Sequence, residues 1–167
     1  MFFSIAVGDE SMTSGISSRL RDLGIALPSL PAAGGNYVPA KTAGNIIYLS
    51  GVISSDAAGI IAGTVGSDCT IEEGYSAART CALTQLAVLQ RHLGGAQDAL
   101  DGIRGILSLN GYVNAIAGFP DSPKVINGAS DVLVEIFGAA GRHVRTAIGV
   151  NALPRNALVE LQMTVEI

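Results

Sequence analysis

Arg145 and Glu160 are the two residues of this chain whose types and surroundings best suit chemistry on a small acid. Arg145 lies in a short, mostly apolar segment, Val144 to Val150, which is predicted to form a strand. The planar guanidinium of an arginine binds a carboxylate through two parallel hydrogen bonds, which a lysine cannot copy. The segment therefore favours an anion site. A structural salt bridge or an exposed arginine on an edge strand is the alternative.

Glu160 lies among apolar neighbours in the segment Leu158 to Leu161. A carboxylate in such surroundings can have a raised pKa and act as a general base, and the alternative is a strand position that faces solvent. If the strands that carry the two residues form a hairpin, Arg145 lies opposite residues 162–164, and Glu160 is roughly 7 to 13 Å farther along at ~3.3 Å per residue. A direct ion pair is therefore disfavoured, which leaves a substrate or a neighbouring subunit as the partner.

Other chemistry-bearing residues lack the spacing of a known site. The sequence contains no GxGxxG, P-loop, HExxH or GxSxG motif. His92 and His143 have no carboxylate or cysteine spaced to complete a metal set, so we expect surface or capping roles for both. Cys69 and Cys81 lack CxxC spacing and are expected to be buried, inert thiols in a reducing compartment. We therefore expect no metal site and no nucleotide cofactor.

The composition limits the class of protein. Apolar residues make up 49% of the 167-residue chain and charged residues only 14%, against roughly 25% charged in usual soluble domains. No stretch approaches the ~20 apolar residues of a membrane-spanning helix, so association between subunits is favoured as the cover for apolar surface. The net charge of −4 opposes binding to phosphate backbones. The apolar N-terminal segment has no basic region like that of a secretory signal, and we expect a cytoplasmic protein.

Two long helices dominate the predicted secondary structure. The first, over residues 70–93, starts with a capping-box pattern of Thr70 and Glu73 and is followed by two glycines. The second, over residues 122–141, has Ser122 as its N-cap and Gly141 at its end. A shorter amphipathic helix is predicted over residues 11–23. The predicted buried stripe of the first long helix consists of Ala78, Ala82, Leu86, Leu89 and Leu93.

Predicted strands precede, separate and follow these helices. They cover residues 45–50, 60–62, 103–113, 144–150 and 158–167, with a turn at 153–156 between the last two. The order ββαβαββ predicts an α+β fold in which helices cover one face of a sheet. We expect a single domain over residues 1–167, with an N-terminal extension over 1–34, which carries the short helix, and a core over 35–167.

The chain resembles the Rid (YjgF) family, and its longer subgroup in particular. Arg145, followed by Leu153-Pro154 and Val159-Glu160, resembles the family's C-terminal signature. Gly35-Asn36-Tyr37-Val38, Gly44-Asn45 and Leu49-Ser50-Gly51 resemble its N-terminal signature, and Val125-Ile126-Asn127 resembles the segment with its active-site asparagine. The likeness covers about residues 35–167.

The resemblance implies a chorismate-mutase-like α+β fold, with a mixed sheet and two long helices on one face. It also implies a homotrimer whose subunits associate through their sheets, with ligand clefts between neighbouring chains. In such a cleft Arg145 would bind the substrate carboxylate, helped by backbone groups near Gly51 and Ala147, and Glu160 would position or activate a water. The implied cleft lining also includes Tyr37, Ser50 and Asn127. Ala147 stands where many members carry a cysteine.

The implied reaction is the hydrolysis of enamines or imines such as 2-aminoacrylate, released by pyridoxal-phosphate enzymes, to 2-keto acids and ammonia without a cofactor. Because an imine carbon is already electrophilic, holding the acid and aligning one water supplies most of the help. A protein that senses 2-keto or amino acids through the same site, without turnover, is an open alternative. RNA cleavage is less favoured, since Arg142, His143, Arg145 and Arg155 are too few for a basic track in an acidic chain.

Overall fold

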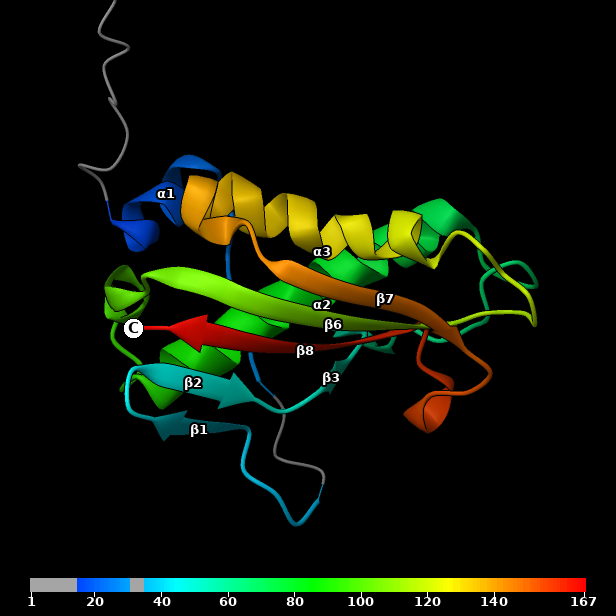
Figure 1. Cartoon of the computed structure of the whole chain (residues 1–167), viewed down its shortest axis with the longest axis horizontal. Helices are drawn as coiled ribbons and strands as arrows, with labels where there is room; N and C mark the ends of the chain where they lie inside the picture. The colour runs from blue at the N-terminus through cyan, green and yellow to red at the C-terminus, as the bar shows by residue number, and fades with distance from the viewer. Residues whose placement is uncertain (1–14, 31–34) are drawn as a thin grey trace, which may run out of the picture.

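A six-stranded mixed β-sheet, covered on one face by two long helices, makes up most of the molecule (Figure 1). The structure is a computed structural model and describes residues 15–30 and 35–167. The fold is thus the α+β arrangement that the order of predicted elements indicates, with the sheet and the helices in separate layers.

The main sheet has the strand order β1-β2-β8-β6-β7, and β3 also pairs with β8. Only the β6–β7 pair is parallel, and the other pairs are antiparallel. Two further strands, β4 and β5, form a small hairpin of their own. The strands are β1 (Ala40–Ala43), β2 (Ile46–Leu49), β3 (Val52–Ile53), β4 (Ser55–Asp56), β5 (Gly59–Ile60), β6 (Gly105–Asn114), β7 (Val144–Val150) and β8 (Val159–Glu166).

The helices are α1 (Ile16–Asp22), α2 (Ile71–His92) and α3 (Ser122–Phe137), with short 3₁₀ turns at Ala99–Gly102, Gly138–Gly141 and Pro154–Asn156. The capping box at the start of α2 is confirmed, because Thr70 Oγ1 accepts a hydrogen bond from Glu73 N and Glu73 Oε2 accepts one from Thr70 N. Helix α3 packs closely on α2 at Gly128, where a Cβ would collide with the carbonyl oxygen of Tyr75. None of the helices in the described residues is long and apolar enough to cross a membrane.

The core lies between the helices and one face of the sheet. Along β8 buried residues alternate with partly exposed ones, so that Val159, Leu161, Met163 and Val165 face the helices. In α2, four residues of the predicted stripe are fully buried, whereas Leu93 is only partly buried. Among the residues that the structure describes, no helix covers the opposite face of the sheet (Figure 1).

The predicted hairpin between the last two strands is wrong. Strand β6 lies between β7 and β8, pairing in parallel with β7 and antiparallel with β8. Helix α3 provides the crossover that a parallel pair requires. Arg145 therefore pairs with Leu109 of β6 and not with residues 162–164.

Several predicted boundaries also need correction. The second long helix is capped by Asp121 instead of Ser122 and ends at Phe137, where Gly138 takes a positive φ of 59°, although a 3₁₀ turn continues to Gly141. The strand β1 was not predicted. The short helix begins at Ile16, and the expected residues 11–14 lie outside the described part of the chain. Neither cysteine is paired; Cys81 is buried as expected, but Cys69 is only partly buried.

Candidate functional site

Glu160 lies on β8, on the sheet face opposite the helices, and is partly buried there. Its direct cross-strand neighbours are Ile53 of β3 and Tyr112 of β6. Gly51 comes so close that a Cβ at that position would collide with Glu160 Oε1. Burial among these groups raises the pKa of the Glu160 carboxyl above its usual value. The residue is therefore a stronger base than an exposed glutamate.

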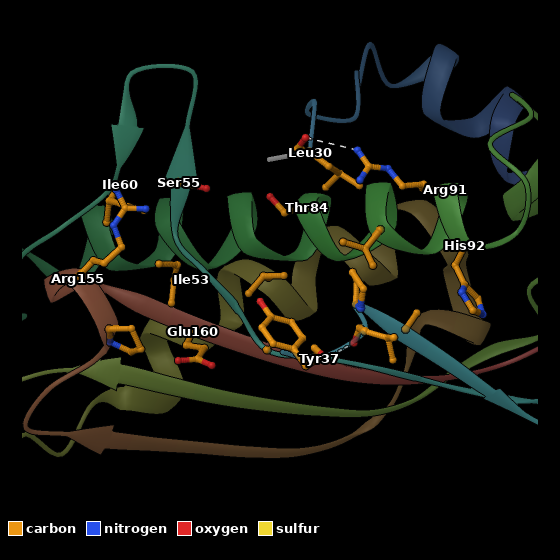
Figure 2. Close-up of a pocket in the computed structure, with 18 residues that line it drawn as sticks. Leu30, Tyr37, Ile53, Ser55, Ile60, Thr84, Arg91, His92, Arg155 and Glu160 are labelled. Atoms are coloured by element: carbon orange, nitrogen blue, oxygen red, sulfur yellow. Dashed lines mark hydrogen bonds between the residues drawn. The ribbon is translucent and has the colours of Figure 1, made fainter. Parts of the chain in front are cut away.

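A pocket of about 910 Å³ opens beside Glu160 (Figure 2). It brings Glu160 together with three other residues of the predicted site, Tyr37, Ser50 and Gly51. The remaining lining residues are Leu30, Val38, Pro39, Ala40, Val52, Ile53, Ser55, Ile60, Thr84, Val88, Arg91, His92, Pro154 and Arg155. They come from the N-terminal segment, α2, the β3–β5 region and the turn before β8.

Buried Gln85 of α2 fixes the chain at Ser50, where β2 ends. Its Nε2 donates hydrogen bonds to Ser50 O (2.8 Å) and to Leu161 O (2.9 Å). The Ser50 hydroxyl donates to Val38 O at 2.7 Å, and Ser50 N donates to Pro39 O at 2.8 Å. The segment with Tyr37 is thereby tied to the strand that leads to Gly51 and Glu160.

Arg145 lies on the edge strand β7 and faces α3. Its Nη1 donates hydrogen bonds to Asn127 Oδ1 (2.8 Å) and Ser130 Oγ (3.1 Å). Among the described residues, no group accepts a hydrogen bond from Nε or Nη2 of this guanidinium. That edge can receive both oxygens of a carboxylate. Ala147, two residues farther along β7, pairs with Gly111 and is partly buried against the core.

His143 supports Arg145 through Ser130. His143 Nδ1 contacts Gly141 O at 2.6 Å, and because a carbonyl oxygen only accepts hydrogen bonds, Nδ1 carries a proton. Burial lowers the pKa of His143; the hydrogen bond to Gly141 acts in the opposite direction, and the charge of Arg145 adds a smaller lowering. The neutral ring therefore accepts a hydrogen bond from the Ser130 hydroxyl through Nε2 at 3.0 Å. The expected surface or capping role of His143 is too simple, since the residue helps to hold Arg145.

The predicted site residues fall into two separate groups within one chain. Arg145 on β7 and Met163 on β8 both pair with Leu109 of β6, so these two residues lie at the same level, two strands apart. Glu160 is three residues from Met163 along β8. Spacings of ~3.3 Å per residue and ~4.8 Å per strand give a backbone separation of roughly 14 Å. The side chains also project from opposite faces of the sheet. Tyr37, Ser50 and Gly51 therefore accompany Glu160, whereas Asn127 and Ala147 accompany Arg145.

Several residues that line the pocket were not predicted from the sequence, namely those of α2 and the turn residue Arg155. Thr84, Val88 and Arg91 follow helical spacing beside the predicted buried stripe, so this pattern could have indicated a second packed face. His92 lines the pocket and contacts Thr42 Oγ1 at 2.8 Å. Arg155 was treated as a turn residue; it lines the pocket from a left-handed backbone conformation, φ 58°. Within the described ranges, no three His, Cys, Asp or Glu residues are grouped to hold a metal ion.

Comparison with known proteins places this arrangement in a family. Residues 17–167 match the family described as "YjgF/chorismate_mutase-like, putative endoribonuclease". "Protein TCP17" of Trypanosoma cruzi is 38% identical over 154 residues, which cover 91% of this chain and 94% of that protein. The resemblance to the Rid (YjgF) family is thereby confirmed.

Solved structures agree with this assignment. A protein of unknown function from Agrobacterium tumefaciens has 38% identity and a TM-score of 0.81, covering 91% of this chain and 92% of that one. A protein from Shewanella oneidensis MR-1, described as a "putative endoribonuclease", has 35% identity and a TM-score of 0.85, covering 92% and 100%. RidA from an Antarctic Psychrobacter, at 23% identity and a TM-score of 0.54 over 82% and 93%, shares the fold. The chain therefore belongs to the Rid (YjgF) family and has its chorismate-mutase-like α+β fold.

Proposed function

We propose that this protein is a hydrolytic deaminase of imines and enamines derived from amino acids, with active sites between the subunits of a homotrimer. The observation that carries the proposal is Glu160, a partly buried carboxylate whose pKa is raised, at the wall of a large pocket. Arg145 supports it, because a guanidinium held by Asn127 and Ser130 keeps one edge for a substrate carboxylate.

Association of subunits accounts for the separation of these two residues. Because Arg145 and Glu160 lie on opposite sheet faces of one chain, one substrate can contact both only if they come from different copies. The helix-free face also carries apolar side chains: Tyr48, Val144 and Ile148 are 52%, 73% and 46% exposed. Contact between such faces would cover them and could bring β7 of one copy to the Glu160 pocket of the next.

The chemistry of the cleft follows from these positions. Arg145 holds the carboxylate of the 2-imino acid, and Glu160 takes a proton from a water whose oxygen bonds to the imine carbon. Glu160 returns that proton to nitrogen, and the carbinolamine loses ammonia as its hydroxyl becomes the keto oxygen. An enamine such as 2-aminoacrylate enters the same path after its tautomerisation to the imine. No oxidant or reductant is consumed.

A sensor of 2-keto acids would use the same Arg145 contacts without turnover, so measurements of turnover decide between the two hypotheses. RNA cleavage is a further candidate function, because the Shewanella relative is described as a "putative endoribonuclease". We do not favour it here because the chain carries a net charge of −4, which opposes the phosphate backbone of RNA.

We predict that the protein sediments at three times the 17.0 kDa chain mass. Val144→Glu should dissociate the trimer. The side chain at this position is 73% exposed in the free subunit, so the added charge stays hydrated there and does not destabilise the fold. In the contact between apolar faces the same charge would lose its hydration, which opposes association. Val144→Thr keeps the branched shape without charge and serves as the control that should stay trimeric. Sedimentation equilibrium at micromolar concentration measures all three, and a wild-type monomer would contradict the assembly.

Arg145→Lys should retain the fold but weaken binding of a 2-keto acid by about 1.5–3 kcal/mol, the value of a charge-assisted hydrogen bond. Isothermal titration with pyruvate measures the change. Arg142→Lys, a neighbouring exposed arginine, is the matched control and should bind as the wild type does. Equal affinity of the Arg145→Lys variant and the wild type would remove the carboxylate-binding role from Arg145.

Glu160→Gln should lower the turnover of 2-aminoacrylate by roughly 10²- to 10⁴-fold, the usual contribution of a general base, while binding of pyruvate changes much less. Glu166→Gln, on the same strand and partly buried like Glu160, is the control. Wild-type turnover should also fall as the pH drops through the raised pKa of Glu160, since only the ionised form takes the proton. A sensor would show no turnover in any form, and normal turnover in Glu160→Gln would make Glu160 structural.

A further inference from the structure

Three hydrogen bonds in series connect the backbone just beyond α3 to the guanidinium of Arg145. His143 Nδ1 donates to Gly141 O at 2.6 Å, which leaves Nε2 of the neutral ring with only a lone pair. The Ser130 hydroxyl therefore directs its hydrogen at Nε2, 3.0 Å away. Its oxygen then accepts the hydrogen bond from Arg145 Nη1 at 3.1 Å. The hydrogens of this series have a single arrangement, and Gly141 O sets it.

The Gly141 end of the series is fixed by packing against α3. Gly141 is buried, and a Cβ at this position would collide with the carbonyl oxygen of Leu133. His143 and Ser130 are both partly buried. Asn127, the other residue that accepts from Arg145, is exposed, and so is Arg145 itself on its edge strand. Ser130 is therefore the anchor of the guanidinium that the packed part of the fold supports.

The two anchors together determine which edge of the Arg145 guanidinium can bind a ligand. Nη1 has two hydrogens, and it donates both to Asn127 and Ser130. Within the described part of the chain, Nε and Nη2 donate to no group, and their N–H bonds form the fork that fits a carboxylate. With Asn127 alone, the guanidinium could rotate about one hydrogen bond, and the fork would face the substrate only part of the time.

We propose that Ser130 and His143 are positioning residues, which hold Arg145 so that its Nε–Nη2 edge meets the carboxylate of the substrate. His143 acts through Ser130, and Ser130 acts through Arg145. The inference rests on the proposed function for the identity of the substrate, but it concerns binding and is measurable without turnover. Loss of the acceptor at His143 Nε2 should weaken binding of pyruvate about fivefold, the usual net value of one hydrogen bond. KM should rise by a similar factor with little change in kcat, because Arg145 holds the carboxylate throughout the reaction.

Two substitutions of His143 separate the two nitrogens of its ring. Asparagine places an amide near the position of Nδ1, so it can still donate to Gly141 O but does not reach Ser130. Glutamine places an amide oxygen near the position of Nε2, where it can accept from the Ser130 hydroxyl. In isothermal titration with pyruvate, His143→Asn should lose about fivefold in affinity, whereas His143→Gln should stay within about twofold of the wild type.

Ser130→Ala removes the middle of the series and should also weaken pyruvate binding about fivefold. Addition of His143→Asn to Ser130→Ala should cause no further loss, because His143 acts only through the hydroxyl that is already absent. Ser17→Ala is the matched control: it removes a serine hydroxyl bond of 3.0 Å, to Asp101, and should bind pyruvate as the wild type does. Thermal unfolding of each variant measures its stability separately.

The outcomes separate this inference from the proposed function. Loss of affinity in His143→Asn, its recovery in His143→Gln and no further loss in the double variant support the inference. The same pattern with no turnover of any imine still supports it but contradicts the deaminase. Wild-type affinity in both His143→Asn and Ser130→Ala overturns it, and so do equal losses in the Asn and Gln variants or losses that add in the double variant. If the wild type binds no pyruvate, the inference and the proposed carboxylate site fail together.

Discussion

The position of β6 between β7 and β8 is the constraint on which the functional interpretation depends. It makes β7 an edge strand, joined to the sheet by a single parallel pairing. Arg145 then faces α3, while Glu160, two strands away, faces the opposite side of the sheet. Arg145 is held by hydrogen bonds to Asn127 and Ser130, and a single chain keeps it apart from Glu160. The proposed cleft between subunits follows from this separation and from the apolar helix-free face.

Each group of residues is held by buried parts of the fold. On the Glu160 side, Gln85 of α2 fixes the carbonyl of Ser50, and the absence of a side chain at Gly51 leaves room for the carboxylate. On the Arg145 side, neutral His143 accepts from Ser130, which in turn accepts from the guanidinium. Both long helices thus serve the site as well as the core. A substrate would find its binding groups already oriented, which is the main contribution that the proposed reaction requires.

Most helices and strands could be predicted from local signals in the sequence, whereas the pairing of distant strands could not. The capping box at Thr70 and the apolar run at 144–150 are features of neighbouring residues, and both elements were found with nearly correct bounds. The order of strands depends on the crossover through α3, which no local pattern encodes, and a short turn at 153–156 wrongly favoured a hairpin. Strand β1 was missed because its buried residue, Ala40, is followed by three exposed ones, without alternation.

The candidate site shows the same division. Residue type and surroundings indicated Arg145 and Glu160 as candidates, and resemblance to the family added their companions; in the fold these residues form two separate groups. The apolar wall formed by Val88 and Ile53 was not predicted, since each residue alone has the character of an ordinary core position. The pocket lining also includes Ser50 and Gly51, between β2 and β3, where Gln85 binds the carbonyl oxygen of Ser50. The size and lining of the pocket depend on tertiary packing.

Complementation between two inactive variants tests the central claim most directly, because it asks whether one active site takes residues from two chains. The Arg145→Ala and Glu160→Gln variants are mixed in equal amounts, unfolded and then refolded together. If each cleft combines Arg145 of one subunit with Glu160 of its neighbour, random mixing in a closed trimer restores roughly a quarter of the sites. Imine hydrolysis should rise to about that share of the wild-type rate. A mixture that forms mixed trimers by mass but is no more active than the separate variants would contradict the shared site.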